Sequence, residues 1–256
     1  MEEKPDKKPN IMQRKGIYLL PNLFTTGSLF LGFFAIVSAM NHQFITAAIA
    51  IYVAMILDSL DGRVARLINA QSAFGAEYDS LSDMVSFGMA PGLVAYNWCL
   101  VNLNNVSLGK IGWLTAFLYV ACVALRLAKF NTMLDDDNPL AKRYFFGLPC
   151  PAAAAVVASL VWVGQYYHLT GMPITIITAI ITIYLALMMV SNVKYRSFKD
   201  FDLKSNVRFT AIVVVVVGYI FISFRPAQVL FIITGAYAIS GPILSVWRRW
   251  RQRSKR

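Results

Sequence analysis

Long apolar stretches separated by short polar segments run through the whole chain. Each stretch approaches the roughly 20 apolar residues that a helix needs to cross about 30 Å of hydrocarbon. The pattern predicts eight transmembrane helices at Leu23–Met40, Phe44–Ile68, Met84–Val101, Leu108–Phe130, Cys150–Tyr166, Pro173–Ser191, Val207–Phe224 and Ala227–Trp247. We therefore expect an all-α, polytopic membrane helix bundle.

The polar segments are too short to bury a core of their own, so no separate soluble domain is expected. We divide the chain into a juxtamembrane segment (residues 1–20), a transmembrane domain (residues 21–247) and a basic tail (residues 248–256). Residues Asn10–Leu20 carry two basic side chains among apolar ones. They fit either an amphipathic interfacial helix or a plain basic flank.

Composition and charge agree with a membrane protein. The chain is 57% hydrophobic and 14% charged, whereas soluble domains carry about 25% charged residues. With eight helices, all but two of the 24 Lys and Arg residues, Lys110 and Arg225, fall on one side. Both termini are therefore expected in the cytoplasm of a multi-pass protein of the cell (inner) membrane. The net charge of +11 favours anionic membrane lipids over nucleic acid as partners.

One polar segment, residues 58–83, holds five of the 13 acidic residues. Asp58 and Asp61 lie three residues apart at the end of the second predicted helix. Asp79 and Asp83 lie four residues apart at the start of the third. Each pair shares one helical face, and a helical hairpin would bring the two faces together. The combined charge is costly at a membrane edge unless cations neutralise it.

The chemistry of these side chains indicates which cations and which ligand they suit. Carboxylates favour hard ions, Mg²⁺, Mn²⁺ or Ca²⁺, over Zn²⁺. Gly62 and Gly75 adjoin the carboxylates and leave room for a bulky ligand, and the guanidinium of Arg66 suits phosphate oxygens. Two divalent cations beside an arginine are typical of displacement at a phosphorus centre.

These residues form a motif of eight fixed positions, D-x2-D-G-x2-A-R-x8-G-x3-D-x3-D, which the chain satisfies at Asp58, Asp61, Gly62, Ala65, Arg66, Gly75, Asp79 and Asp83. By this motif the chain resembles the CDP-alcohol phosphotransferase family. Residues 82–92, 124–131 and 147–154 resemble the phosphatidylserine synthases within it. Lys129 stands where those enzymes usually have Arg, and Cys150 where they have Ser.

The resemblance implies a role for each acidic residue of the motif. Asp58, Asp61 and Asp79 would be metal ligands, and Asp83 would be both a metal neighbour and the general base. The implied cofactors are two divalent cations, Mg²⁺ or Mn²⁺, with Ca²⁺ as an inhibitory or crystallographic substitute.

The resemblance also implies the substrates. CDP-diacylglycerol would bind at Gly62, Arg66 and Gly75, and its nucleotide would reach Asn22 and Thr25. The last two residues also fit an ordinary helix start after Pro21. The enzyme would transfer the phosphatidyl group to the hydroxyl of L-serine, giving phosphatidylserine and CMP, and would act as a homodimer.

The acceptor site is expected at Arg126, Lys129 and Asn131, which fall on the same predicted face as the aspartates. Arg126 is the best candidate for the carboxylate of serine. Two alternatives stay open. A sister enzyme would use glycerol phosphate, inositol phosphate or choline. A transporter would place its carboxylates near the bilayer midplane, whereas these lie at helix ends beside an arginine.

Overall fold

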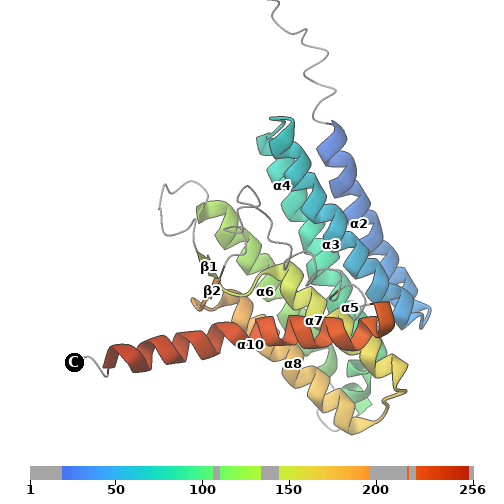
Figure 1. Ribbon diagram of the computed structural model, residues 1–256. Coiled ribbons are helices and arrows are strands. Elements are labelled where there is room, and N and C mark those ends of the chain that lie inside the picture. Colours follow the sequence, from blue (N-terminus) through green and yellow to red (C-terminus); the bar gives the residue numbers. More distant parts are fainter. Residues whose placement is uncertain (1–18, 106–109, 134–143, 197–217, 219–222, 254–256) are drawn as a thin grey trace, which may run out of the picture.

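The computed structural model describes residues 19–105, 110–133, 144–196, 218 and 223–253 (Figure 1). In chain order these residues form α2 (Leu19–Met40), α3 (Phe44–Leu67), α4 (Ala73–Asp83), the π-helical segment η1 (Met84–Met89), α5 (Ala90–Trp98), the 3-10 segment η2 (Leu100–Asn105), α6 (Ile111–Met133), β1 (Tyr144–Phe146), α7 (Cys150–Tyr166), α8 (Met172–Val190), β2 (Lys194–Arg196) and α10 (Pro226–Arg253). In Figure 1, α2 and α3 run side by side, and α10 crosses α7.

Within these described ranges, five helices are long and apolar enough to cross a membrane: Leu19–Met40, Phe44–Leu67, Ile111–Thr132, Met172–Val190 and Pro226–Ser245. They indicate an integral membrane protein and begin and end close to the predicted stretches. The shorter apolar helix α7 has the predicted bounds. The predicted helix Val207–Phe224 and the segment Asn10–Leu20 lie almost wholly outside the described residues.

The predicted helix from Met84 to Val101 starts too late, whereas its predicted end lies close to the end of α5 at Trp98. Helical structure begins at Ala73, where the side chain of Ser72 caps α4 by accepting a hydrogen bond from the backbone of Gly75 (3.0 Å). It passes through η1 and α5 and ends at Trp98. The aspartates of this segment therefore stand within a helix, as their four-residue spacing predicts.

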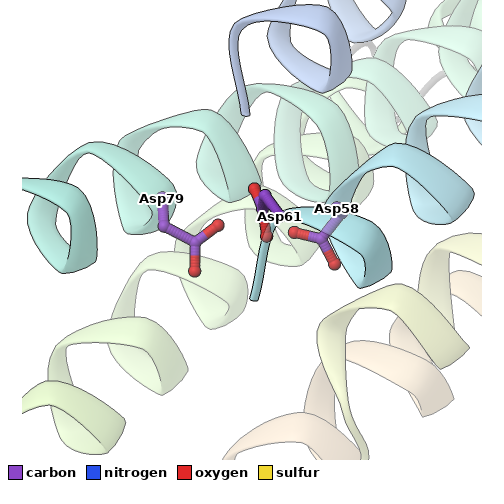
Figure 2. Close-up of side chains that lie close together, drawn as sticks. All are labelled: Asp58, Asp61 and Asp79. Carbon is purple, nitrogen blue, oxygen red and sulfur yellow. The ribbon is translucent and has the colours of Figure 1, made fainter. Parts of the chain in front are cut away.

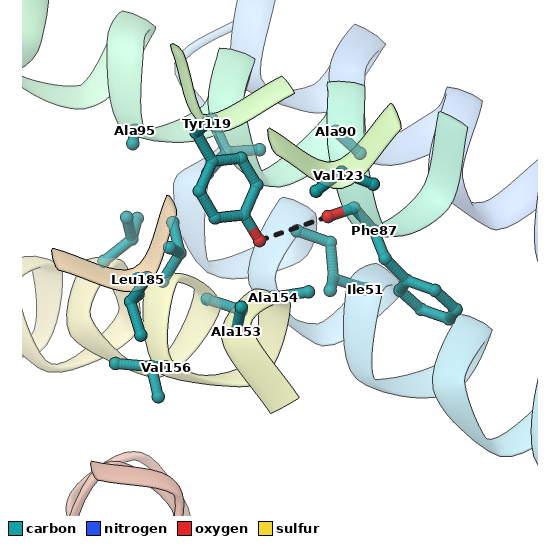
Figure 3. Close-up of a cluster of buried hydrophobic side chains, with 14 of the residues drawn as sticks. Ile51, Phe87, Ala90, Ala95, Tyr119, Val123, Ala153, Ala154, Val156 and Leu185 are labelled. Carbon is teal, nitrogen blue, oxygen red and sulfur yellow. Dashed lines mark hydrogen bonds between the residues drawn. The ribbon is translucent and has the colours of Figure 1, made fainter. Parts of the chain in front are cut away.

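Proline chemistry explains the irregular segment η1. Pro91 has no N–H, so it cannot donate the helical hydrogen bond to the carbonyl of Phe87, four residues earlier. Tyr119 of α6 supplies a donor instead, and its hydroxyl donates to that carbonyl at 3.1 Å (Figure 3). Because a buried carbonyl without a donor is costly, this bond ties α6 to η1.

Two serines fix the same helix against α2. Ser82 donates to the carbonyl of Thr25 at 3.1 Å, and Ser86 donates to the carbonyl of Ser28 at 2.9 Å. Gly32 faces Ser86 so closely that an added Cβ would collide with it. The N-terminal half of α2 is thereby held beside the helix that carries Asp79 and Asp83.

The core lies where α3, η1, α6 and α7 meet (Figure 3). The fully buried Ile51, Phe87 and Tyr119 pack there against small side chains of α7 such as Ala153 and Ala154. Small residues let apolar helices approach closely.

An antiparallel ribbon of two short strands, with Tyr144 opposite Arg196, is the one departure from the all-α prediction in the described ranges. Gly147 follows β1 with φ 81°, a conformation that glycine adopts easily. Its amide donates to the carbonyl of Val193 at 2.9 Å, and the next amide, of Leu148, donates to the carbonyl of Met188 at 3.0 Å. The ribbon thus fixes the start of α7 against the end of α8.

Candidate active site

Three carboxylates from two helices face one another at the centre of the site (Figure 2). Asp58 and Asp61 project from the C-terminal part of α3, and Asp79 projects from α4. One oxygen atom of each lies within 4.8 Å of the corresponding oxygen atoms of the other two. Asp61 is the most enclosed of them, with 5% of its surface exposed. The helical hairpin expected from the sequence thus brings the two acidic faces together.

Asp83 stands one turn after Asp79, close enough for the charges of Asp58 and Asp79 to act on it. Burial, followed by those charges, raises the pKa of Asp83 well above its usual range. Burial likewise raises the pKa of Asp79 to about 7, with smaller contributions from the charges of Asp61 and Asp58. Without a counter-charge, these groups oppose one another's ionisation.

Two observations on the described residues indicate that this site suits a divalent cation. One carboxylate oxygen each of Asp79 and Asp83 is buried and has no hydrogen-bond partner. A buried acceptor without a donor is costly. The clustered donors are all carboxylate oxygens, which are the ligands that hard cations prefer.

Thr25 joins α2 to this cluster. Its hydroxyl donates to one carboxylate oxygen of Asp61 at 2.6 Å. Asn22 lies one turn earlier on α2, and its side-chain oxygen is 3.6 Å from where a Cβ of Gly75 would stand. The structure therefore brings Asn22, Thr25 and Gly75, three of the residues that the resemblance assigns to CDP-diacylglycerol, into one region, although they come from helices far apart in sequence.

Arg66 lies over Gly62 on the exposed side of α3. One guanidinium nitrogen is 3.6 Å from the position that a Cβ of Gly62 would occupy. This is an ordinary contact distance, so the guanidinium packs directly over the glycine. A cationic side chain at this position suits an anionic ligand such as a pyrophosphate.

The three expected acceptor residues have different partners. Arg126 Nη1 donates to the sulfur of Cys150 at 3.0 Å. Lys129 Nζ donates to Asn192 Oδ1 at 2.9 Å. Asn131 Nδ2 donates to Ser80 Oγ at 3.1 Å.

Arg126 and Asn131 thus contact the parts of the bundle around the carboxylates, whereas Lys129 is turned toward the end of α8. Their partners Cys150 and Ser80 were not predicted from the sequence. The partners lie 24 and 51 residues away along the chain, so no local spacing could indicate them.

Comparison with known proteins supports the resemblance inferred from the motif. Residues 18–191 match the CDP-alcohol phosphatidyltransferase family. The chain is 40% identical over 228 residues to the CDP-diacylglycerol–serine O-phosphatidyltransferase of Helicobacter pylori. The aligned residues make up 89% of this chain and 91% of the relative. The enzyme of the same name from Bacillus subtilis is 37% identical over 180 residues, covering 70% of this chain and 91% of the relative.

A third relative, the CDP-diacylglycerol–serine O-phosphatidyltransferase of Mycobacterium bovis, is 41% identical over 155 residues, covering 60% of this chain and 52% of the relative. The family match spans α2 to α8 and so includes the four aspartates, Arg66 and Arg126. The chain belongs to the CDP-alcohol phosphatidyltransferase family.

Proposed function

We propose that this protein transfers the phosphatidyl group of CDP-diacylglycerol to the hydroxyl of L-serine, giving phosphatidylserine and CMP. The observation that carries the proposal is the carboxylate cluster of α3 and α4, in which Asp58, Asp61 and Asp79 meet beside Asp83. The choice of serine rests on the activity that names relatives such as the Helicobacter pylori enzyme, matched over 91% of its length.

We assign two divalent cations, Mg²⁺ or Mn²⁺, to Asp58, Asp61, Asp79 and Asp83. When bound, they would neutralise pyrophosphate charge and lower the pKa of the acceptor hydroxyl. The buried, unpartnered oxygens of Asp79 and Asp83 support this assignment.

In the proposed reaction, Asp83 accepts the proton of the serine hydroxyl. The serine oxygen forms a bond to the phosphorus that carries diacylglycerol, and the bond from that phosphorus to the oxygen of CMP breaks. Arg66 donates to phosphate oxygens as CMP leaves with the electron pair.

The nucleotide end of the substrate is assigned to residues that lie beside the carboxylates on α2, α3 and α4: Asn22, Thr25, Gly62 and Gly75. The two glycines carry no side chain, which would let a phosphate approach the backbone closely. Thr25 holds the carboxylate of Asp61 in place from the other side.

The acceptor end is assigned to α6. Arg126 would pair with the carboxylate of serine, with Lys129 and Asn131 as further polar contacts. The bond from Asn131 to Ser80, the residue after Asp79, supports a position close to the reacting hydroxyl.

We further propose eight membrane helices, the three-part division at residues 20 and 247 made above, and a homodimer. Both termini and the active site would face the cytoplasm in the cell (inner) membrane, among anionic lipids.

The variant Asp136→Cys, in a background without Cys99, Cys122 and Cys150, tests the orientation. A membrane-impermeant thiol reagent should label it only after the cells are opened. Labelling from outside sealed cells would overturn the orientation.

CMP release from CDP-diacylglycerol by the purified protein tests the function. The acceptors to compare are serine, glycerol phosphate, inositol phosphate and choline, each with Mg²⁺, with Mn²⁺ and with a chelator. We expect release with serine and a divalent cation only. Release with another acceptor instead of serine would assign the protein to a sister activity. No release with any acceptor would refute the proposal.

A further inference from the structure

A buried contact between α6 and α7 stands next to the proposed acceptor site. Arg126 Nη1 donates to the sulfur of Cys150 at 3.0 Å, and Cys150 has no exposed surface. Thiol sulfur is a weak acceptor, so a guanidinium gains little binding energy from it alone. The contact instead fixes the direction in which the guanidinium points.

A second donor of the same arginine has no partner. Nε of Arg126 is buried and donates to no described residue. In a guanidinium, Nη1 and Nε–H point to different sides, and each side can bind a carboxylate through two parallel hydrogen bonds. Holding Nη1 by a thiol therefore leaves the Nε side for an incoming carboxylate.

Cys150 is well placed for this task. It is the first residue of α7, and prolines at 149 and 151 restrict the backbone on both sides of it. The segment α7 packs against η1, which directly follows Asp83. The thiol contacts Arg126 directly, and the charge of Asp83 also acts on it.

We propose that Cys150 is a positioning residue for the acceptor: its thiol holds Nη1 of Arg126 so that the Nε side meets the carboxylate of serine while the serine hydroxyl reaches Asp83. This inference rests on the proposed function. It gives a chemical role to a residue that departs from the serine usual at this position, since a hydroxyl also accepts a hydrogen bond.

The test compares Cys150→Ala and Cys150→Ser with Cys122→Ala, which removes another buried thiol one turn before Arg126 on the same helix. Loss of one weak hydrogen bond, here to a thiol acceptor, corresponds to about a two- to tenfold effect. We expect Cys150→Ala to raise the KM for serine by that factor, with kcat and the KM for CDP-diacylglycerol unchanged. Cys150→Ser and Cys122→Ala should both keep the KM of the unmodified enzyme.

If Cys150→Ala does not fold, as judged by thermal unfolding, Cys150→Val replaces it, since valine fills the space and also lacks an acceptor. A double-mutant cycle then separates positioning from direct contact. In an Arg126→Lys background, removing the thiol should add no further loss.

Additive losses, or a serine KM equal in Cys150→Ala and Cys122→Ala, would overturn the inference. Both outcomes require serine-dependent CMP release by the unmodified enzyme. Absence of that release would instead be a failure of the proposed function.

Discussion

The two sides of the site are built in opposite ways. The metal side, Asp58, Asp61, Asp79 and Asp83, gathers like charges from α3 and α4. On the acceptor side, the cationic guanidinium of Arg126 is held by the weakly accepting thiol of Cys150 and by no described acid. Asn131 is hydrogen-bonded there to Ser80. The first arrangement favours bound cations, because its like charges oppose one another's ionisation, and in the proposed reaction it acts on CDP-diacylglycerol. The second is expected to select the acceptor, so substitutions should separate turnover from serine recognition.

The largest effect is expected from Asp83→Asn. The amide keeps the size of the side chain but removes the proposed base, so turnover should fall by about 10²- to 10⁴-fold. Binding of CDP-diacylglycerol should persist because Asp58, Asp61 and Asp79 stay. Pre-steady-state CMP release and a separate binding measurement check this. Near-normal turnover at saturating cation would exclude Asp83 as the base.

A smaller effect is expected from Thr25→Val, which removes the 2.6 Å hydrogen bond to Asp61 and keeps the shape of the side chain. Loss of a group that orients a metal ligand typically lowers metal affinity or activity by about 10- to 100-fold. Thr26→Val is the matched control, because Thr26 contacts Tyr78 instead. Manganese titration of both variants is the measurement. Equal affinities would show that Thr25 does not orient Asp61.

Arg126→Lys tests the acceptor side. Lysine keeps the charge but cannot form two parallel hydrogen bonds to a carboxylate. Losing a charge-assisted hydrogen bond costs about 1.5 to 3 kcal/mol, which predicts at least a roughly tenfold loss in kcat/KM for serine.

The KM for CDP-diacylglycerol should change little in the same Arg126→Lys variant. Ethanolamine, which lacks the carboxylate, is the control acceptor for the unmodified enzyme. Unaltered serine kinetics, or equal use of ethanolamine, would remove Arg126 from serine recognition.

The smallest expected effect is the change with pH in the metal-free stability of the protein and in the affinity of the four aspartates for manganese. The pKa of Asp79 is raised from 3.8 to about 7, so its folded form favours the proton. Metal-free stability should therefore fall as pH rises from about 4 to about 7. A cation competes with that proton, so manganese affinity should rise several-fold between about pH 6 and pH 8. Calorimetric titration checks this, and an affinity independent of pH would contradict it.

The metal side was predictable from sequence because its geometry is local. The spacings within Asp58–Asp61 and Asp79–Asp83 place each pair on one helical face, and the short connection between the helices brings the pairs together. Most apolar helices were predictable for the same reason, since a membrane span depends on its own composition.

The acceptor side and η1 were not predictable in this way. The partners of Arg126 and Asn131 come from helices whose packing is decided by the whole bundle. The π-helical segment depends on Pro91 and on a hydroxyl from Tyr119, 32 residues from the carbonyl that accepts it. A hydropathy pattern carries no information about such distant partners, and it also missed the capped start of α4 in a polar segment.

The central claim is that the carboxylates of α3 and α4 hold the divalent cations that the reaction needs. Anomalous diffraction from crystals grown with Mn²⁺ and CDP-diacylglycerol tests it directly. We expect manganese peaks among the side chains of Asp58, Asp61, Asp79 and Asp83, and their loss in Asp61→Asn. Manganese bound elsewhere, with no peak at these four side chains in an active protein, would contradict the account.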